Sequence, residues 1–255
     1  MDASRWTFPP FSFMKNLTTK EKSGLYSISQ KRIFSKGNYV FQAKANQLND
    51  SVYVLLSGRV KLFRLAPGGK ESIQWLCMSG EIFGLSEDNH SPYLGLNAQS
   101  LTSSEILCIS RKDFNQYLLD HPQLALLVIS QLTQRIRTLG DMLLNLASDD
   151  VMSRLTKVLT RLCYQHGKLN GDNIILDIPL TQQEIADMIG SSRQTVNSSL
   201  SELRKQGYLK IENQCIHIMD SNILSKYLQH NANENKQDKG VSALNEICLP
   251  LGEQQ

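Results

Sequence analysis

The sequence predicts an α+β protein with an N-terminal β-roll or jelly roll, one long dimerisation helix and a C-terminal winged helix-turn-helix. Three observations support this prediction. Short apolar runs broken by glycine occupy the first half, as in small antiparallel barrels. A heptad pattern of apolar residues follows them. Residues 180–208 then hold two short helical patterns joined by a glycine, which is the helix-turn-helix arrangement.

Composition is that of a globular protein with more than one domain. The chain has 255 residues, of which 41% are hydrophobic and 20% charged, and its formal net charge is +3. That charge permits nucleic-acid binding without arguing for it. No apolar run of about 18 residues is present and the N-terminus lacks the apolar core of a signal peptide, so we expect no membrane span and a cytoplasmic location.

Cysteine usage argues against a disulfide framework or a zinc site. The number of cysteines is odd, they are scattered, and no C-x-x-C pair occurs. We expect free thiols at Cys77, Cys108, Cys163, Cys215 and Cys248.

The first half is predicted to form strands. After an irregular arm and a short helix near 18–25, strands are expected at 51–56, 60–65, 72–78, 94–101 and 105–110. Pro67-Gly68-Gly69 should join two of them as a hairpin. Within 60–65, Val60 and Leu62 should lie on one face and Lys61 and Phe63 on the other.

The apolar heptad pattern predicts a dimerisation helix. From Ala125 onward, apolar residues recur at gaps of 4, 3, 4, 3, 4 and 3. A helix packed only on its own roll would favour a wider apolar stripe, so the pattern favours a two-stranded dimer helix whose first end, near 126–128, also packs on the roll. We call the expected dimer contact the seam: Ile129, Leu132, Ile136, Leu139, Leu143 and Leu146.

Capping signals define the helix-turn-helix. A helix at 151–166 and a strand at 174–180 precede it. Thr181 and Glu184 form a capping box, Gly190 suits a tight turn, and Ser191 or Ser192 can cap a second helix. The expected buried side chains are Ile185, Met188, Ile189, Val196, Leu200 and Leu203.

The second helix leaves one polar face outward, which we call the readout face: Arg193, Gln194, Asn197, Ser198 and Ser201. An ordinary helical hairpin with a solvated face is the alternative, but both caps, the glycine turn and a bare polar face together favour a helix that enters the DNA major groove. Residues 209–211 and 215–218 should form the wing hairpin. A short helix at 222–228 and a disordered tail at 229–255 complete the chain.

The order of elements resembles the superfamily of the cyclic AMP receptor protein and the fumarate-nitrate reduction regulator (CRP/FNR). The resemblance covers residues 30–228. It rests on S-S-R-Q-T-V-N at 191–197, on D-V-M-S-R-L at 150–155, which looks like the family hinge, and on Gly37, Gly58, Gly69, Gly80 and Gly84. It implies a cyclic-nucleotide-binding-like sensor at 1–120, a dimerisation helix at 121–148, a DNA-binding domain at 149–228 and a tail at 229–255.

The same resemblance implies a homodimer that reads a palindromic operator and recruits or blocks RNA polymerase. Arg193 falls on the position that reads guanine, and Gln194 falls where many relatives carry glutamate, so adenine is expected there. Asn197 and Ser198 fall on the remaining readout positions, Ser198 in place of an arginine of the best-known members. Phosphate contacts are expected from Gln182, Ser192 and Thr195.

The effector is not expected to be cyclic AMP. Relatives that bind it use a glutamate, an Arg-Ser pair and a Thr-Ser pair, which fall here on Leu85, on 94–95 and on 139–140. Between Glu71 and Lys112 the only cation is Arg111, so a cyclic phosphate would lack its partner. The resemblance places the effector pocket at Gly84, Leu85 and Leu139.

The expectations for other cofactors depend on single residues. No cysteine precedes Cys77, so no iron–sulfur cluster is expected. The haem ligands of the CO-sensing relative fall on Gly84 and Ser86, which cannot bind iron. Haem sensing of CO or NO through Cys77 or His90, redox sensing through Cys77 or Cys108, a small metabolite and no ligand at all stay open.

Enzyme activity is not expected, because no phosphate-binding loop, nucleophile elbow or H-E-x-x-H occurs and the histidines are dispersed. The competing class is a ligand-binding module that acts by protein contact without DNA. Binding to duplex DNA that weakens steeply with salt would separate the two.

Overall fold

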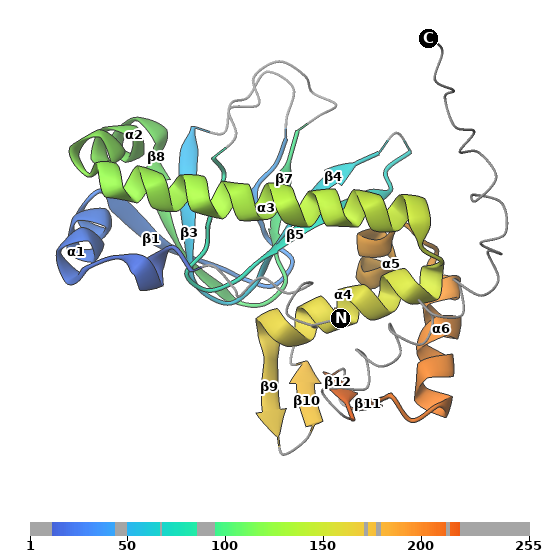
Figure 1. Cartoon of the computed structure of the whole chain (residues 1–255). Helices are drawn as coiled ribbons and strands as arrows, with labels where there is room; N and C mark the ends of the chain where they lie inside the picture. The colour runs from blue at the N-terminus through green and yellow to red at the C-terminus, as the bar shows by residue number, and fades with distance from the viewer. Residues whose placement is uncertain are drawn as a thin grey trace, which may run out of the picture.

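The computed structural model describes residues 12–43, 50–66, 68–85, 95–170, 173–176, 180–212 and 215–219. These residues form a β-roll, a long helix that lies along it and a smaller C-terminal domain (Figure 1). The predicted fold class and order of elements are confirmed. No helix in these ranges is long and apolar enough to cross a membrane. The predicted helix at 222–228 and the tail at 229–255 lie outside the described residues.

Two four-stranded antiparallel sheets make the β-roll. One has the strand order β1-β8-β3-β6 and the other β2-β7-β4-β5. Stacked aromatic rings fill the space between them, with the Phe41, Tyr53 and Phe83 centroids 5.3–6.3 Å apart. The strands are β1 (Ser29–Phe34), β2 (Tyr39–Phe41), β3 (Ser51–Ser57), β4 (Val60–Leu65), β5 (Glu71–Cys77), β6 (Ile82–Phe83), β7 (Asn97–Ser100) and β8 (Ser104–Ser110).

The predicted strands did not include β1, β2 or β6. β1 is an edge strand whose residues Gln30 to Ile33 are exposed, so only its pairing with β8 reveals it. β6 has two residues and no periodicity to read.

Strand β4 is buried on both faces, although its sequence alternates. Val60 and Leu62 face the interior of the roll, and Phe63 packs with Ile73 of β5 against the C-terminal domain. The outer face of the β4–β5 hairpin is therefore covered by another part of the chain.

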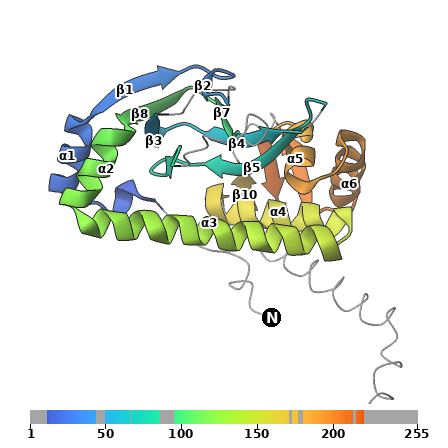
Figure 2. The same ribbon diagram turned by 90° about the horizontal axis from the view of Figure 1, so that it is seen from above.

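Three helices flank the roll: α1 (Thr19–Ser27), α2 (Arg111–Asp120) and α3 (Pro122–Ser148). Helix α3 extends from the roll to the C-terminal domain (Figure 2). Its inner face buries Leu124, Val128, Gln131 and Thr138. The expectation that residues 126–128 pack on the roll holds for Val128, whereas Leu126 is exposed.

The C-terminal domain combines three helices with a four-stranded sheet of order β11-β12-β10-β9. Strand β9 begins at Gly167. A Cβ there would lie 2.3 Å from Ile174 Cγ2, so only glycine fits. The elements are α4 (Val151–His166), β9 (Gly167–Asn170), β10 (Asn173–Leu176), α5 (Gln182–Ile189), α6 (Arg193–Lys205), β11 (Leu209–Glu212) and β12 (Cys215–Ile218).

Candidate nucleic-acid interface

Helices α5 and α6 begin at the predicted caps. The Thr181 side chain accepts a hydrogen bond from the Glu184 amide, and the Glu184 carboxylate accepts one from the Thr181 amide at 2.8 Å. Gly190 ends α5 at φ 65° and ψ 40°, the left-handed conformation that favours glycine. Ser192 Oγ then accepts from the Thr195 amide at 3.1 Å and caps α6.

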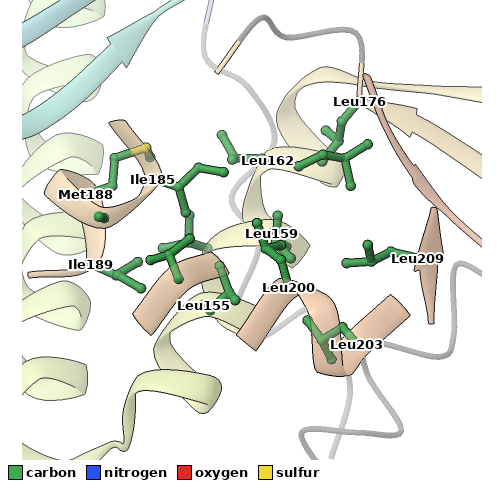
Figure 3. Packing of buried hydrophobic residues seen from close by; sticks show 14 of the residues in the cluster. Leu155, Leu159, Leu162, Leu176, Ile185, Met188, Ile189, Leu200, Leu203 and Leu209 are labelled. Carbon is green, nitrogen blue, oxygen red and sulfur yellow. The ribbon is translucent and has the colours of Figure 1, made fainter. Parts of the chain in front are cut away.

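A buried apolar core holds the two helices in place (Figure 3). Ile185, Met188 and Ile189 of α5 meet Leu200 and Leu203 of α6 over helix α4, as the spacing predicted. Strands β10 and β11 close this core from the side with Leu176 and Leu209. The opposite, polar face of α6 is therefore fixed in an outward orientation.

Every predicted base-reading side chain is exposed: Arg193, Gln194, Asn197 and Ser198. Gln182 Nε2 donates to Asn197 Oδ1 at 3.0 Å, which brings a predicted phosphate contact beside a predicted base contact. Ser192 and Thr195 are also exposed, and their hydroxyl groups lie 2.8 Å apart at the start of α6. The positive end of the helix dipole is there, which favours a phosphate.

The predicted wing is a two-stranded hairpin after α6. β11 and β12 pair in antiparallel register from Leu209 opposite Ile218 to Glu212 opposite Cys215. The tip at 213–214 lies outside the described residues. With the helix-turn-helix, this hairpin completes a winged helix.

The sequence matches two family profiles over these parts. Residues 153–227 match the Crp-like helix-turn-helix domain, and residues 31–121 match the cyclic nucleotide-binding domain. The global nitrogen regulator of Nostoc sp. (strain PCC 7120) is 33% identical over 180 residues, which cover 69% of this chain and 80% of that protein. The chain belongs to the CRP/FNR family of transcriptional regulators.

Other relatives of this CRP/FNR regulator agree. The CRP-like cAMP-activated global transcriptional regulator of Mycobacterium tuberculosis is 29% identical over 76% of this chain and 85% of its own. Among solved structures, a CooA mutant from Carboxydothermus hydrogenoformans superposes with a TM-score of 0.67 at 24% identity, over 80% of this chain and 90% of that one. FixK2 from Bradyrhizobium japonicum gives 0.67 at 20% identity over 78% and 96%. These two structures show the fold.

The predicted effector-pocket residues lie in different surroundings. Arg111 donates to the carbonyl oxygens of Gly84 at 2.8 Å and Leu85 at 3.2 Å. Leu85 packs beside the cluster that joins the roll to α1, α2 and the start of α3. Leu139 instead lies on the exposed seam of α3. His90 lies outside the described residues.

A buried polar network that the sequence did not suggest joins α3 to the β-roll. Arg135 Nη2 donates to Glu81 Oε2 at 2.9 Å and to the Ile82 carbonyl at 2.8 Å. Trp75 Nε1 donates to the same Glu81 oxygen at 2.9 Å. Burial raises the pKa of Glu81, and the Arg135 guanidinium opposes that shift. No sequence signal links Glu81 to Arg135, because 53 residues separate them.

Helix α5 is held at both ends by parts of the regulator outside its own helix-turn-helix. At its start, Lys61 Nζ of β4 lies 2.5 Å from Glu71 and 3.8 Å from the capping residue Glu184. At its end, Arg154 donates to the Ile189 carbonyl at 3.0 Å and to the Asp149 carbonyl at 2.7 Å. Helix α5, which supports α6, therefore contacts both the β4–β5 hairpin of the roll and the segment that joins α3 to α4.

Cys77 and Cys108, which the sequence offered as candidate redox or haem-binding residues, have thiols of low reactivity. Cys77 is fully buried, and burial raises the pKa of its thiol although the Arg135 charge opposes this. Burial likewise raises the pKa of Cys108, against the nearby Arg32 charge. Both thiols therefore stay protonated and weakly nucleophilic at neutral pH.

Proposed function

We infer that this CRP/FNR regulator binds an inverted-repeat operator as a homodimer, with one α6 in the major groove of each half-site. The observation that carries this inference is the exposed readout face of α6, fixed on the buried core described above. Helix-turn-helix dimers place their two recognition helices about one turn of DNA apart, roughly 34 Å.

The exposed stripe on α3 supports the dimer. In the single chain its members are 37–69% exposed, a large apolar surface for one side of a helix. Read as a heptad, Ile129, Ile136 and Leu143 take one core position and the three remaining leucines take the other. Isoleucine at the first core position of the heptad and leucine at the second favour a parallel coiled coil of two helices. A parallel pair would place both DNA-binding domains at the same end.

The half-site follows from the side chains on α6. Arg193 suits guanine O6 and N7, and Gln194 suits adenine N6 and N7. Asn197 and Ser198 complete the base contacts, while Gln182, Ser192 and Thr195 contact phosphates. Because a serine replaces the second arginine of the best-known members, we expect an operator that differs from theirs.

Replacing Arg193 with alanine tests this assignment. We expect binding to weaken by about 1–3 kcal/mol per half-site and the preference for guanine at one base pair of each half to disappear. Quantitative band-shift titrations against the operator and its single-base variants measure both effects. Arg137→Ala removes the same charge from an exposed position on α3 outside the seam and should change neither. Wild-type affinity and base preference in Arg193→Ala would contradict the assignment.

The proposed effector is a small molecule or gas other than cyclic AMP. Arg111 is engaged by the Gly84 and Leu85 carbonyls, and Arg135 is paired with the Glu81 carboxylate. Neither is free for a cyclic phosphate. The protonated thiols of Cys77 and Cys108 favour a metabolite over thiol redox sensing or thiolate ligation of haem.

Effector control would reach the DNA through α3 and α5. Arg135 ties α3 to the roll, and Lys61 ties α5 to the β4–β5 hairpin. A rearrangement of the roll would therefore shift the support of α6 as well as the dimer helix, which is a coupling between two sites. The regulator would act in the cytoplasm by recruiting or blocking RNA polymerase.

A further inference from the structure

An open groove of about 560 Å³ lies where the C-terminal end of α6 meets the first wing strand β11. Arg204 and Lys205 line it from α6, and Lys210 lines it from β11. Among the described residues that line it, Glu212 is the one acid, so these lining residues carry an excess of positive charge. All three cations are exposed, and within the described part of the chain none has an ion-pair or hydrogen-bond partner for its side chain.

The groove continues the readout face. At 3.6 residues per turn, Arg204 and Lys205 fall within the same arc of about 140° as Arg193, Gln194 and Ser198. Ser201, which belongs to the readout face, also lines the groove. The surface that would read bases therefore runs directly into the cationic groove.

The length of α6 places this groove beyond the bases. Arg204 follows Arg193 by eleven residues, or about 16 Å along the helix axis. The major groove is about 12 Å wide, so a helix that reads bases with its first turns extends over the sugar–phosphate backbone at its end. Basic residues in a last helical turn also offset the helix dipole. That role accounts for Arg204 and Lys205 but not for Lys210, which faces the same groove from a strand.

We propose that this groove binds backbone phosphates of the DNA strand that flanks the bases read by α6. The inference rests on the proposed function and adds a second, sequence-independent set of contacts to it. The occupant is duplex DNA, because the groove is continuous with the readout face and its charge is opposite to that of phosphate.

The test uses full-length Arg204→Gln/Lys210→Gln protein and a 40-base-pair duplex of random sequence. Affinity is titrated between 50 and 200 mM KCl. Each lost phosphate contact should make the slope of log affinity against log salt shallower by about 0.9. Because both subunits of a dimer carry the two substitutions, its slope should become shallower by about 2 to 4. On a selected operator the base preference should stay that of the wild type, because phosphate contacts carry no base information.

Lys20→Gln/Lys112→Gln is the matched control, since it removes two exposed charges from α1 and α2 of the sensor domain. It should keep the wild-type slope. Arg204→Lys/Lys210→Arg keeps both charges and should keep the slope as well. If the Arg204→Gln/Lys210→Gln variant had the same salt slope as the control, the proposal would be overturned. This holds even if that variant no longer bound an acidic protein, because the groove would then serve a protein partner and not DNA. If the groove variant keeps the wild-type slope while Arg193→Ala still weakens operator binding, only the proposal for the groove is refuted. If the wild-type protein binds no DNA, both the groove proposal and the proposed function are refuted.

Discussion

Replacing Ile136 with aspartate is expected to convert the dimer into a monomer at micromolar concentration. Ile136 lies in the middle of the seam and is 69% exposed in the single chain. Two-fold symmetry would bury two unpaired carboxylates against each other, at a cost of several kcal/mol. We expect dimerisation to weaken by at least about 4 kcal/mol, roughly a thousand-fold in Kd. Sedimentation equilibrium over a concentration series measures this change.

Ile33→Asp is the matched control for this experiment. Ile33 lies on edge strand β1 and is 67% exposed, but it is outside the seam. Its replacement should leave the dimer intact. Ile136→Asp should also bind the inverted repeat much more weakly while keeping its affinity for one half-site. A dimer of unchanged Kd in Ile136→Asp would place the contact between subunits elsewhere on the chain.

The second large effect is expected at Glu81. Glu81→Gln should lower the free energy of unfolding by about 3 kcal/mol, because it leaves the Arg135 guanidinium buried without its counter-charge. The new amide can still accept the hydrogen bond from Trp75, so the loss reports mainly on the ion pair. Urea unfolding, followed by tryptophan fluorescence, measures the change.

An exposed ion pair supplies the comparison. Lys31 and Glu105 lie 3.0 Å apart on the outer surface of the roll, with side chains 53% and 38% exposed. Glu105→Gln should therefore cost less than about 1 kcal/mol. Glu81→Leu/Arg135→Met removes both buried charges and should recover much of the loss. If Glu81→Gln were no more harmful than Glu105→Gln, the network would not hold α3 to the roll.

The features that the sequence predicted well are those with local causes. A capping box needs residues three apart, and Gly190 needs one left-handed position, so Thr181 to Ser192 could be read directly. The seam is periodic along one helix for the same reason. These signals were sufficient for the winged helix and for the outward direction of Arg193 and Asn197.

The features that the sequence did not reveal join residues far apart in the chain. Lys61 meets Glu184, and Arg135 meets Glu81, only because the domains pack in this arrangement. The burial of both faces of β4 has the same origin, since Phe63 alternates with Leu62 as in any half-buried strand. The polar edge strand β1 has no apolar pattern and is defined by its partner β8. The exposed polar face of α6 could therefore be predicted from the sequence, whereas the contacts that join its support to the β-roll could not.

The most direct test of DNA recognition through α6 is the selection of binding sites by the purified full-length protein from a pool of random duplex DNA. We predict an enriched inverted repeat with half-site centres about one helical turn apart, roughly 34 Å, and a guanine at one fixed position in each half. Arg193→Ala should select the same repeat without that guanine. No enriched sequence, or a single unrepeated motif, would contradict a dimer that reads DNA through α6.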